Sequence, residues 1–424
     1  MDLYYAEKCS IKNTGKNITG HFIKGDAATE LMILQDHWQG KLQMIYLDPP
    51  FFTGNAFYFK QRIGEKGWEG DTKYIITHQA YSDQWIDRAS FVNMLRQVLT
   101  LSHKLLKPEG SLFLHLDYRF SPHARLLMDE IFGEENFLNE IIWAYRTGGR
   151  AKRHFSRKHD TILFYRKSNQ HFFDPEAVGK PRGPLKRNNM KRQKDKDGRI
   201  FWSIRSGGKE YRYYEDSIII PSDVWDDISH LQQKDPERTG YDTQKPESLL
   251  ERMVLSTTRQ GDWVGDFFAG SGTTLAVAQK NGRKWLAVDK SVFSMYVSRK
   301  RLLQLISEGF FVFSDSSLKI TNSSDSSNVL YTVSFSDKNT IKVKLVDYSC
   351  KQIPCLSNNF LDYVDFWSVG YINSDRYFVQ DYTFRTHTNP FIKQELAIPI
   401  IEVKSEIAVH IVDIYGKQSL IIIR

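Results

Sequence analysis

The architecture of this chain can be worked out from one short stretch, Met44-Ile45-Tyr46-Leu47-Asp48-Pro49-Pro50-Phe51. Its four leading apolar residues predict a short buried strand. Asp48 comes where this strand should end, and two prolines, which fix φ and lack an N–H, then stop it. We therefore expect a carboxylate, free carbonyl oxygens and the Phe51 ring at the C-terminal edge of a sheet, where open α/β sheets bind ligands. This set suits a planar group with an exocyclic amine. The alternative is a sharp turn with no further function.

The segments around this stretch alternate between strand and helix patterns, which predicts a mostly parallel sheet with helices on both faces. Strands are expected at 21–26, 44–47, 111–116, 140–145, 161–165, 263–267 and 284–288. Helices are expected at 28–38, 91–106 (capped by Ser90), 123–132, 246–258, from 274 to about 281, and at 291–307. Residues 52–89 show no clear period and contain four glycines, so we expect an irregular lid over the site or, alternatively, a surface insertion.

A second motif, Asp266-Phe267-Phe268-Ala269-Gly270-Ser271-Gly272-Thr273-Thr274, joins a strand end to a Gly-rich turn that opens a helix. It is not a P-loop, because no Gly-Lys-Ser/Thr follows, and Leu275 replaces the third glycine of a dinucleotide fingerprint. Asp266 would repel a pyrophosphate but suits an ammonium group. Asp289 ends the next strand, where an acid accepts hydrogen bonds from ribose hydroxyls in such folds. A nucleoside with a positive charge and no phosphate fits S-adenosylmethionine.

A basic block interrupts the α/β pattern. Between Arg150 and Arg212 there are 19 Lys and Arg residues against six Asp and Glu, a surplus larger than the net charge of +8 of the whole chain. Such a block indicates a polyanion-binding surface. The alternative is a solvated linker, but aromatic residues are interleaved, and disordered basic segments are poor in them. We expect a folded nucleic-acid-binding surface with contacts at Arg150, Lys152, Arg153, Arg157, Lys158, Lys186, Arg187, Lys191 and Arg192.

The rest of the chain bounds the class of protein. Residues 314–328 are rich in Ser, Asn and Asp and predict a linker, and period-two runs at 329–335, 340–346, 377–384, 407–412 and 420–423 predict a small antiparallel β domain. Three cysteines argue against a disulfide framework, and no Cys/His set completes a metal site. With no signal segment and no apolar run of ~18 residues, we expect a cytosolic protein without a membrane partner.

Together the two motifs resemble those of the amino-group DNA methyltransferases. The catalytic motif Asp48–Phe51 precedes the basic block and the cofactor motif follows it, an order that resembles the permuted β class of largely adenine-N6 enzymes, which includes modification subunits of restriction systems. Thr243-Gln244-Lys245-Pro246-Glu247 resembles the lead-in motif that adds a cofactor contact. Gly25-Asp26 resembles the strand-end acid near the cofactor's adenine. The resemblance covers about Phe22 to Leu303, apart from most of the basic block.

This resemblance implies a Rossmann-like α/β fold for S-adenosylmethionine-dependent methyl transfer, with an inserted basic target-recognition region and a C-terminal β-sandwich-like domain. The implied division is 1–149 and 243–313 for the two halves of the methyltransferase domain, 150–242 for the insert, 314–328 for the linker and 329–424 for the β domain. The implied catalytic residues are Asp48, Pro49, Pro50 and Phe51. The implied cofactor-binding residues are Asp26, Asp48, Lys245, Pro246, each residue from Asp266 to Thr274, and Asp289.

The resemblance also implies roles and partners. Phe51 would stack on a flipped base while Asp48 and the Pro49 carbonyl accept its amino hydrogens. Asp rather than Ser in this motif favours adenine N6 over cytosine N4. An RNA or protein methyltransferase and a catalytically silent DNA-binding subunit are the alternatives. Phe51 departs from the Tyr that the family often has, and Asp289 from its more usual Glu. Double-stranded DNA is the implied partner, beside a second copy or a restriction or defence subunit, in the prokaryotic cytoplasm near the nucleoid.

Overall fold

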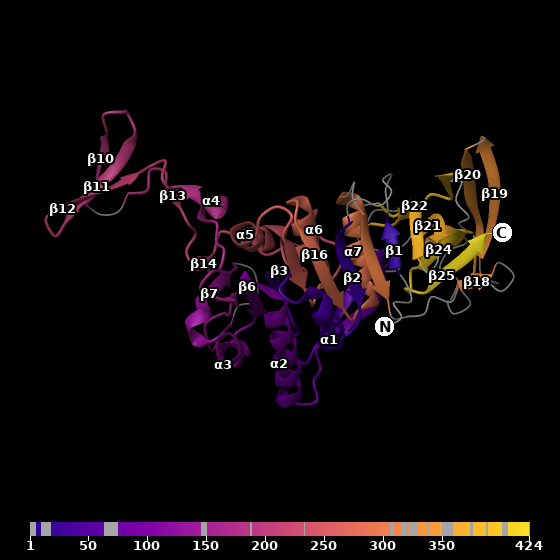
Figure 1. Cartoon of the computed structure of the whole chain (residues 1–424), viewed down its shortest axis with the longest axis horizontal. Helices are drawn as coiled ribbons and strands as arrows, with labels where there is room; N and C mark the ends of the chain where they lie inside the picture. Colours follow the sequence, from indigo (N-terminus) through magenta and orange to yellow (C-terminus); the bar gives the residue numbers. More distant parts are fainter. Residues whose placement is uncertain are drawn as a thin grey trace.

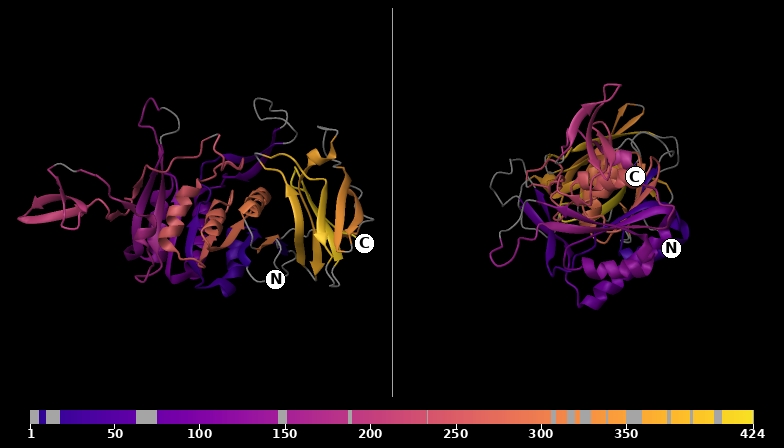
Figure 2. Two further views of the ribbon diagram at one scale, coloured as in Figure 1. Left: turned by 90° about the horizontal axis from the view of Figure 1, so that it is seen from above. Right: turned by 90° about the vertical axis from the view of Figure 1, so that its left-hand side faces the viewer.

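The computed structural model describes residues 6–9, 18–62, 75–145, 151–186, 189–232, 234–305, 309–314, 320–322, 329–337, 339–349, 359–373, 376–386, 389–400 and 406–423. The molecule is elongated. An α/β body lies in the middle, a slender β arm extends from one end, and a layered β region forms the other end (Figures 1 and 2). Within the described ranges, no helix is both long enough and apolar enough to cross a membrane.

The α/β body is built on a mostly parallel sheet. Its strands are β2 (Ile18–Lys24), β3 (Leu42–Leu47), β6 (Leu106–Leu116), β7 (Phe137–Ala144), β8 (His159–Arg166), β15 (Trp263–Asp266), β16 (Lys284–Asp289) and β17 (Gly309–Ser314). The spatial order is β7-β8-β6-β3-β15-β16-β2-β17. All neighbours from β6 to β17 run parallel, whereas β8 is antiparallel to both β6 and β7. The predicted α/β class is confirmed, and β17 is a strand that the sequence pattern did not reveal.

The sheet interleaves strands from distant parts of the chain. Although β2 and β3 are consecutive strands, β15 and β16 lie between them. Tyr46 of β3 pairs with Asp266 of β15, so the two motifs, more than 200 residues apart in the sequence, end at the same edge of the sheet. This pairing is what creates a single site from the two motifs.

Helices cover both faces of this sheet (Figure 1). One face carries α1 (Ala27–Trp38), α2 (Arg88–Leu105) and α3 (Ser121–Phe132), and the other α5 (Glu247–Thr257), α6 (Thr273–Lys280) and α7 (Val292–Leu305). Side chains alternate along β3, so Ile45 and Leu47 join the core of the first face, and Met44 and Tyr46 that of the second. Because β3 is buried on both faces, it reads as a continuous apolar run.

The predicted irregular segment 52–89 is largely a β-hairpin, so that prediction was wrong in its local structure. Strands β4 (Ala56–Arg62) and β5 (Ile75–Ser82) pair antiparallel, and three of the four glycines lie between them, outside the described residues. Two predicted helix starts also need correction. Asp87, not Ser90, caps α2, because its carboxylate accepts from the Ser90 N–H at 2.7 Å. Pro246 is the N-cap of α5 rather than its first residue.

The basic block folds into an arm that projects away from the body (Figures 1 and 2). Its elements are α4 (Pro175–Val178), β9 (Lys180–Pro181), β10 (Lys191–Lys194), β11 (Ile200–Ser206), β12 (Lys209–Tyr214), β13 (Ile218–Ile219) and β14 (Val224–Trp225). β10, β11 and β12 form an antiparallel meander at the tip, and β9 pairs with β13 at its base. β14 returns to the edge of the central sheet beside β7.

The C-terminal region is rich in strands and has two layers. Its strands are β18 (Ile320–Asn322), β19 (Val329–Asp337), β20 (Thr340–Tyr348), β21 (Val364–Asn373), β22 (Arg376–Phe384), β23 (Glu395–Pro399), β24 (Glu406–Asp413) and β25 (Gln418–Ile423). β19, β20 and β23 form one layer over a core shared with β21, β24 and β25. β1 (Ala6–Cys9) pairs with both β17 and β22, so the other layer continues the central sheet. β18 lies inside the predicted linker, and β21 and β23 were not predicted.

Candidate active site

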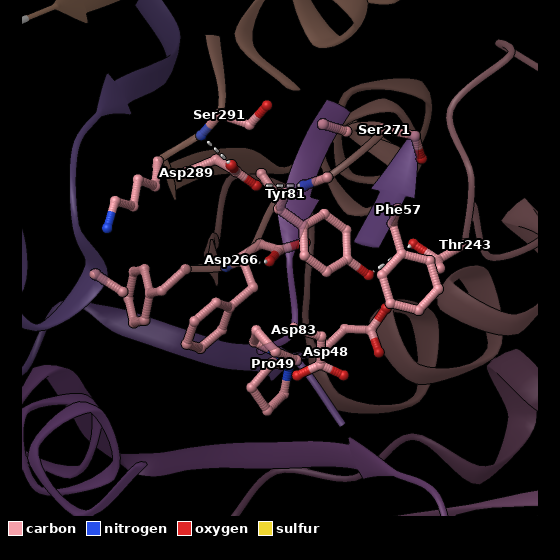
Figure 3. A pocket seen from close by; sticks show the side chains of 18 of the residues that line it. Asp48, Pro49, Phe57, Tyr81, Asp83, Thr243, Asp266, Ser271, Asp289 and Ser291 are labelled. Atoms are coloured by element: carbon pink, nitrogen blue, oxygen red, sulfur yellow. Dashed lines mark hydrogen bonds between the residues drawn. The ribbon is translucent and has the colours of Figure 1, made fainter. Parts of the chain in front are cut away.

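A cavity of about 560 Å³ opens at the C-terminal ends of β2, β3, β15 and β16. Four aspartates, one from each strand end, line it: Asp26, Asp48, Asp266 and Asp289. The structure therefore brings together the catalytic and cofactor motifs that the sequence predicted (Figure 3). Of the predicted catalytic and cofactor-binding residues, Pro246 and Gly272 do not line the cavity. Gly272 instead provides the left-handed backbone conformation of the turn.

Asp48 presents a carboxylate with one occupied and one free oxygen. Its Oδ2 accepts a hydrogen bond from Lys245 Nζ and forms an ion pair with it at 2.5 Å. Its Oδ1 is buried and has no hydrogen-bond partner among the described residues. A buried acceptor without a donor is costly, so this oxygen is suited to an N–H group that a ligand brings. Lys245 also lies 5.2 Å from the centroid of the Phe51 ring, and so it contacts two residues of the catalytic motif.

The turn after Pro50 is held by an aspartate that the sequence analysis missed. The two prolines have no N–H, and the next three backbone N–H groups, of Phe51, Phe52 and Thr53, all donate to Asp83 at 3.1, 3.0 and 2.7 Å. Asp83 is 1% exposed. Each such donor left unsatisfied in a buried site would cost about 1–3 kcal/mol. The signal available was an acid followed by an aromatic residue, Asp83-Gln84-Trp85, directly after the second hairpin strand.

The Gly-rich turn is shaped by Asp266, which begins it, and by Asp289, which ends the neighbouring strand β16. Asp266 accepts from the Phe268 N–H at 3.1 Å, and Asp289 from the N–H groups of Gly270 and Ser291, both at 2.7 Å. Gly272 has a φ of 71°, and a Cβ there would lie 2.5 Å from Ser298 Oγ. Only glycine fits this position, which lets the turn enter α6 closely against α7.

The lead-in segment is attached to the Gly-rich turn through Thr273. The Thr273 hydroxyl donates to the Lys245 carbonyl at 3.1 Å and accepts from Arg301 Nη1 at 3.0 Å. Arg301 is 7% exposed, and its Nη2 pairs with Glu247 at 2.6 Å. The segment from 243 to 247 and the turn from 266 to 274 are thereby fixed to each other, and Lys245 is directed at Asp48.

Burial changes the acid–base behaviour of the strand-end aspartates. Desolvation raises the pKa of the Asp266 carboxyl to about 7, and the nearby charges of Asp48 and Asp289 act in the same direction. Burial also raises the pKa of Asp289, against the lowering effect of the Ser291 and Gly270 N–H groups. The cavity as a whole is lined by five aspartates and two lysines. Such a lining favours a cationic ligand, whose charge would restore the ionised form of Asp266.

Two aromatic residues of the β4–β5 hairpin form a wall of the cavity that sequence reasoning did not assign. The rings of Phe57 and Tyr81 stack at 4.9 Å between centroids. The Tyr81 ring lies between Asp289 on one side and Asp48 on the other, and its hydroxyl is 3.4 Å from Thr243 Oγ1 (Figure 3). The hairpin therefore places side chains beside both the cofactor motif and the catalytic motif.

Behind the catalytic motif lies a buried polar chain. Tyr46 Oη is 2.7 Å from His115 Nδ1, and His115 Nε2 is 3.2 Å from Asp160 Oδ2. A carboxylate only accepts, so His115 Nε2–H donates a hydrogen bond to Asp160. In the neutral imidazole, Nδ1 then accepts a hydrogen bond from the Tyr46 hydroxyl. His115 is fully buried, its ring lies 5.9 Å from that of Phe51, and it supports the catalytic ring from behind.

Asp26 has a structural role besides its place in the cavity. It caps α1 by accepting from the Thr29 N–H at 3.2 Å. Its carboxylate is exposed, unlike those of Asp48 and Asp266.

The predicted DNA contacts fall into two groups. Lys152, Arg153, Arg157 and Lys158 lie between β7 and β8, where Arg157 donates to Tyr118 Oη at 2.8 Å. Lys186, Lys191 and Arg192 belong to the arm, and all three are exposed. Arg192 forms an ion pair with Glu215 at 2.9 Å, so part of the arm's charge is neutralised within the arm. Arg150 and Arg187 lie outside the described residues.

The described residues include no cluster of three or more His, Cys, Asp or Glu side chains that could hold a metal ion.

A carboxylate with a buried, partnerless oxygen and a Gly-rich turn, at adjacent strand ends of a parallel sheet, form the arrangement expected of an amino-group methyltransferase. The chain belongs to the DNA methylase family: its residues 42–300 match the family of N6 and N4 DNA methylases. Enzymes of this family transfer a methyl group from S-adenosylmethionine. The family match includes both motifs and the whole arm.

The chain is also similar to individual proteins. The type II methyltransferase M.EcaI of Enterobacter cloacae is 26% identical over 308 residues, which cover 62% of this chain and 64% of that relative. The DNA adenine methyltransferase YhdJ of Escherichia coli strain K12 is 27% identical over 270 residues, which cover 63% and 77%. Among solved structures, a protein of Thermus thermophilus that is described as a DNA modification methylase gives a TM-score of 0.43 at 18% identity and covers 70% of this chain and 99% of its own.

Proposed function

We propose that this protein methylates the exocyclic N6 of an adenine flipped out of duplex DNA. The observation that carries the proposal is the partnerless, buried Asp48 Oδ1, held beside Pro49, Pro50 and Phe51 in the cavity that also contains the Gly-rich turn. An exocyclic amine offers the two N–H groups that this oxygen and the Pro49 carbonyl would accept. Inside a duplex this amine is paired, so the base must first leave the stack at a cost of a few kcal/mol.

The residues of the cavity would share the work as follows. Phe51 would stack on the flipped base, and Asp48 would orient its amine, with the Lys245 ammonium group holding the carboxylate in place. Asp266, Asp289 and Asp26 would hold S-adenosylmethionine, together with the turn from Phe267 to Thr274. That cofactor supplies the methyl group. The negative lining suits its positive charge, and Gly270, which has no side chain, leaves room for close approach of a nucleoside to the backbone.

Adenine is favoured over cytosine by two observations. The catalytic motif begins with Asp rather than Ser, and YhdJ, which is similar over 63% of this chain, is named a DNA adenine methyltransferase. Because the family includes N4 enzymes, N4-methylcytosine is the second candidate product.

The basic block would bind the duplex as a target-recognition region, and Lys152, Arg153, Arg157, Lys158, Lys186, Lys191 and Arg192 would contact its phosphates. Their long cationic side chains are exposed, or partly so for Lys158, on the segment between β7 and β8 or on the arm. A second copy of the chain or a restriction or defence subunit would be a further partner. We place this activity in the cytoplasm, at the nucleoid.

Nucleoside mass spectrometry tests the proposal directly. Unmethylated duplex DNA is incubated with the protein and S-adenosylmethionine, digested and analysed for N6-methyladenine and N4-methylcytosine. We expect N6-methyladenine. The variant Asp48→Ala should lower its yield by at least ~100-fold, because the amine loses its acceptor, while cofactor binding persists. N4-methylcytosine would overturn the assignment of the base, and an unchanged yield with Asp48→Ala would overturn the assignment of the catalytic residue.

A further inference from the structure

Asp83 connects the β4–β5 hairpin to the catalytic motif. It follows the last residue of β5, and its carboxylate faces the turn after Pro50. Four donors converge on it: the N–H groups of Phe51, Phe52 and Thr53, and the indole Nε1–H of Trp85 at 3.2 Å. The backbone of the same residue adds two bonds, from Asp83 N–H to the Asn55 carbonyl and from Gly54 N–H to the Asp83 carbonyl. The contact therefore joins the turn and the hairpin at both the side-chain and the backbone level.

The conformation of the turn depends on this carboxylate. Phe52 has a φ of 58°, in the left-handed region that a bulky residue rarely adopts. Such a conformation persists only where the surroundings impose it. Pro49 and Pro50 cannot contribute N–H bonds of their own, so the three donors that follow them provide the restraint. All three N–H groups donate to the Asp83 carboxylate.

The charge of Asp83 is neutralised by N–H dipoles. Arg119, whose charge interacts with that of Asp83, forms its ion pair with Asp117. A carboxylate held by several backbone N–H groups is an anion in a fixed nest, which suits a permanent positioning contact better than a mobile one. Because every donor belongs either to the catalytic turn or to Trp85 on the cavity wall, the fixed geometry is that of the cavity itself.

We propose that Asp83 is a positioning residue for methyl transfer, which sets the angle of Asp48 and Phe51 toward the flipped base by fixing the turn that follows them. It acts through these two residues and does not touch the reacting atoms. The inference rests on the function proposed above. It differs from a purely structural role, in which Asp83 would stabilise the fold without affecting the rate of the chemical step.

Asp87 offers a matched control only four residues away. Its carboxylate also accepts from a backbone N–H and a hydroxyl, both of Ser90, but at the start of α2 rather than at the cavity. Asp83→Ala and Asp87→Ala therefore each remove a carboxylate that holds local backbone. Only the first releases the catalytic turn.

The test compares three properties of the full-length variants. These are the single-turnover rate of tritium transfer from labelled S-adenosylmethionine to unmethylated genomic DNA, the dissociation constant of the cofactor, and the melting temperature. For Asp83→Ala we expect a rate about 100-fold lower, as for small displacements of reacting groups, with little change in cofactor affinity. Asp83→Asn, which keeps one acceptor oxygen, should fall between this variant and the wild type. Asp87→Ala should melt earlier but keep its rate.

Two results would overturn the inference. One is a rate for Asp83→Ala no lower than that of Asp87→Ala. The other is a loss of rate that parallels equal losses of cofactor affinity and melting temperature, as expected of a residue that only stabilises the fold. If Asp83→Ala does not fold, the comparison uses Asp83→Asn. Failure of the proposed function would look different, because the wild-type protein itself would then transfer no methyl group to DNA.

Discussion

Asp266 is a carboxylate that favours ligand binding and opposes folding. Its pKa is about 7 in the folded chain, against 3.8 for a free aspartate, mainly because burial disfavours the charged form. The folded state therefore binds more protons than the unfolded state between these two values. Stability from this group is full at pH below about 4, falls as the pH rises toward 7 and stays lost above it. A cationic ligand reverses the effect by stabilising the ionised carboxylate.

The variant Asp266→Asn tests this trade-off. The amide keeps an acceptor for the Phe268 N–H but carries no charge, so the melting temperature of the ligand-free protein at pH 8 should rise. Since each pKa unit corresponds to about 1.4 kcal/mol, the gain should reach a few kcal/mol. The gain should disappear near pH 4, and S-adenosylmethionine binding should be weakened at every pH. Melting curves and calorimetric titrations from pH 4 to 8 measure both effects. A variant less stable than the wild type at pH 8 would contradict the argument.

Among single residues, the sequence predicted those whose signals are local. Asp48, Asp266 and Asp289 each end a buried strand, and that pattern is visible within a few residues. Asp83 and Tyr81 could not be assigned in this way, because their roles depend on a hairpin that folds back over the strand ends. Lys245 was predicted as a cofactor contact, yet its ion pair with Asp48 links residues 197 positions apart in the sequence.

At the level of elements, the arm presents two different faces. Residues that pair across its strands share a face, so Trp202, Tyr213 and Tyr211 lie on one face together with Lys194 and Lys209. Tyr211 and Tyr213 are 47% and 37% exposed. Lys191 and Arg212 lie on the opposite face, where Arg212 pairs with Glu210 at 2.9 Å. The aromatic face, which also carries Arg192, combines cations with exposed rings, so we expect it to contribute more to DNA binding than the face with Lys191.

Removing charge from the aromatic face should reduce the salt dependence of DNA binding. Each phosphate contact contributes about 0.9 to the slope of log K against log salt, so Lys194→Ala with Lys209→Ala should lower the slope by about 2. Arg199→Ala with Asp216→Ala removes an exposed ion pair of 2.8 Å without a change in net charge and serves as the control. Fluorescence anisotropy at several salt concentrations measures the slopes. Equal slopes for both double variants would show that the aromatic face is exposed to solvent but makes no contact with DNA phosphates.

The hairpin and the helix starts show why elements were predicted unevenly. Strands β4 and β5 show no strict alternation of apolar and polar residues, and the glycines between them also hid the pairing. Ser90 was expected to cap α2 because serine is a common N-cap, yet Asp87 lies three residues earlier and its ionised oxygen is the stronger acceptor. Long amphipathic elements such as α2 were predicted well since their apolar period is repeated over many residues.

On the scale of the whole molecule, the body and the C-terminal region share a core. One cluster of buried residues contains Val264 and Met295 from the body together with Phe366 and Val412 from the C-terminal strands. Lys300 of α7 also forms an ion pair with the buried Asp365 at 2.7 Å. The sequence could not indicate this continuity, because it depends on β1, whose partners β17 and β22 lie about 300 and 370 residues away in the sequence.

A shared core predicts a single unfolding transition. Differential scanning calorimetry of the full chain should show one cooperative peak for the body and the C-terminal region together. A fragment that ends at residue 313 should melt well below the full chain or fail to fold, since loss of the C-terminal region uncovers the apolar side of β17 and α7. Two separate peaks, or a fragment as stable as the intact protein, would show instead that the C-terminal region is an independent domain.

The base of the arm has a consequence for how such proteins diversify. β9 and β13 are only two residues each and run antiparallel side by side. On the side toward the tip of the arm, two further bonds join the segments, from Arg182 N–H to the Ser217 carbonyl and from Gly183 N–H to the Glu215 carbonyl, both 2.8 Å. The two chain segments that lead into the arm therefore meet at one point. A genetic recombination with both crossovers there would exchange the arm as a cassette, and with the target-recognition role proposed for the arm, we expect the recombinant to keep its chemistry and acquire a different target sequence.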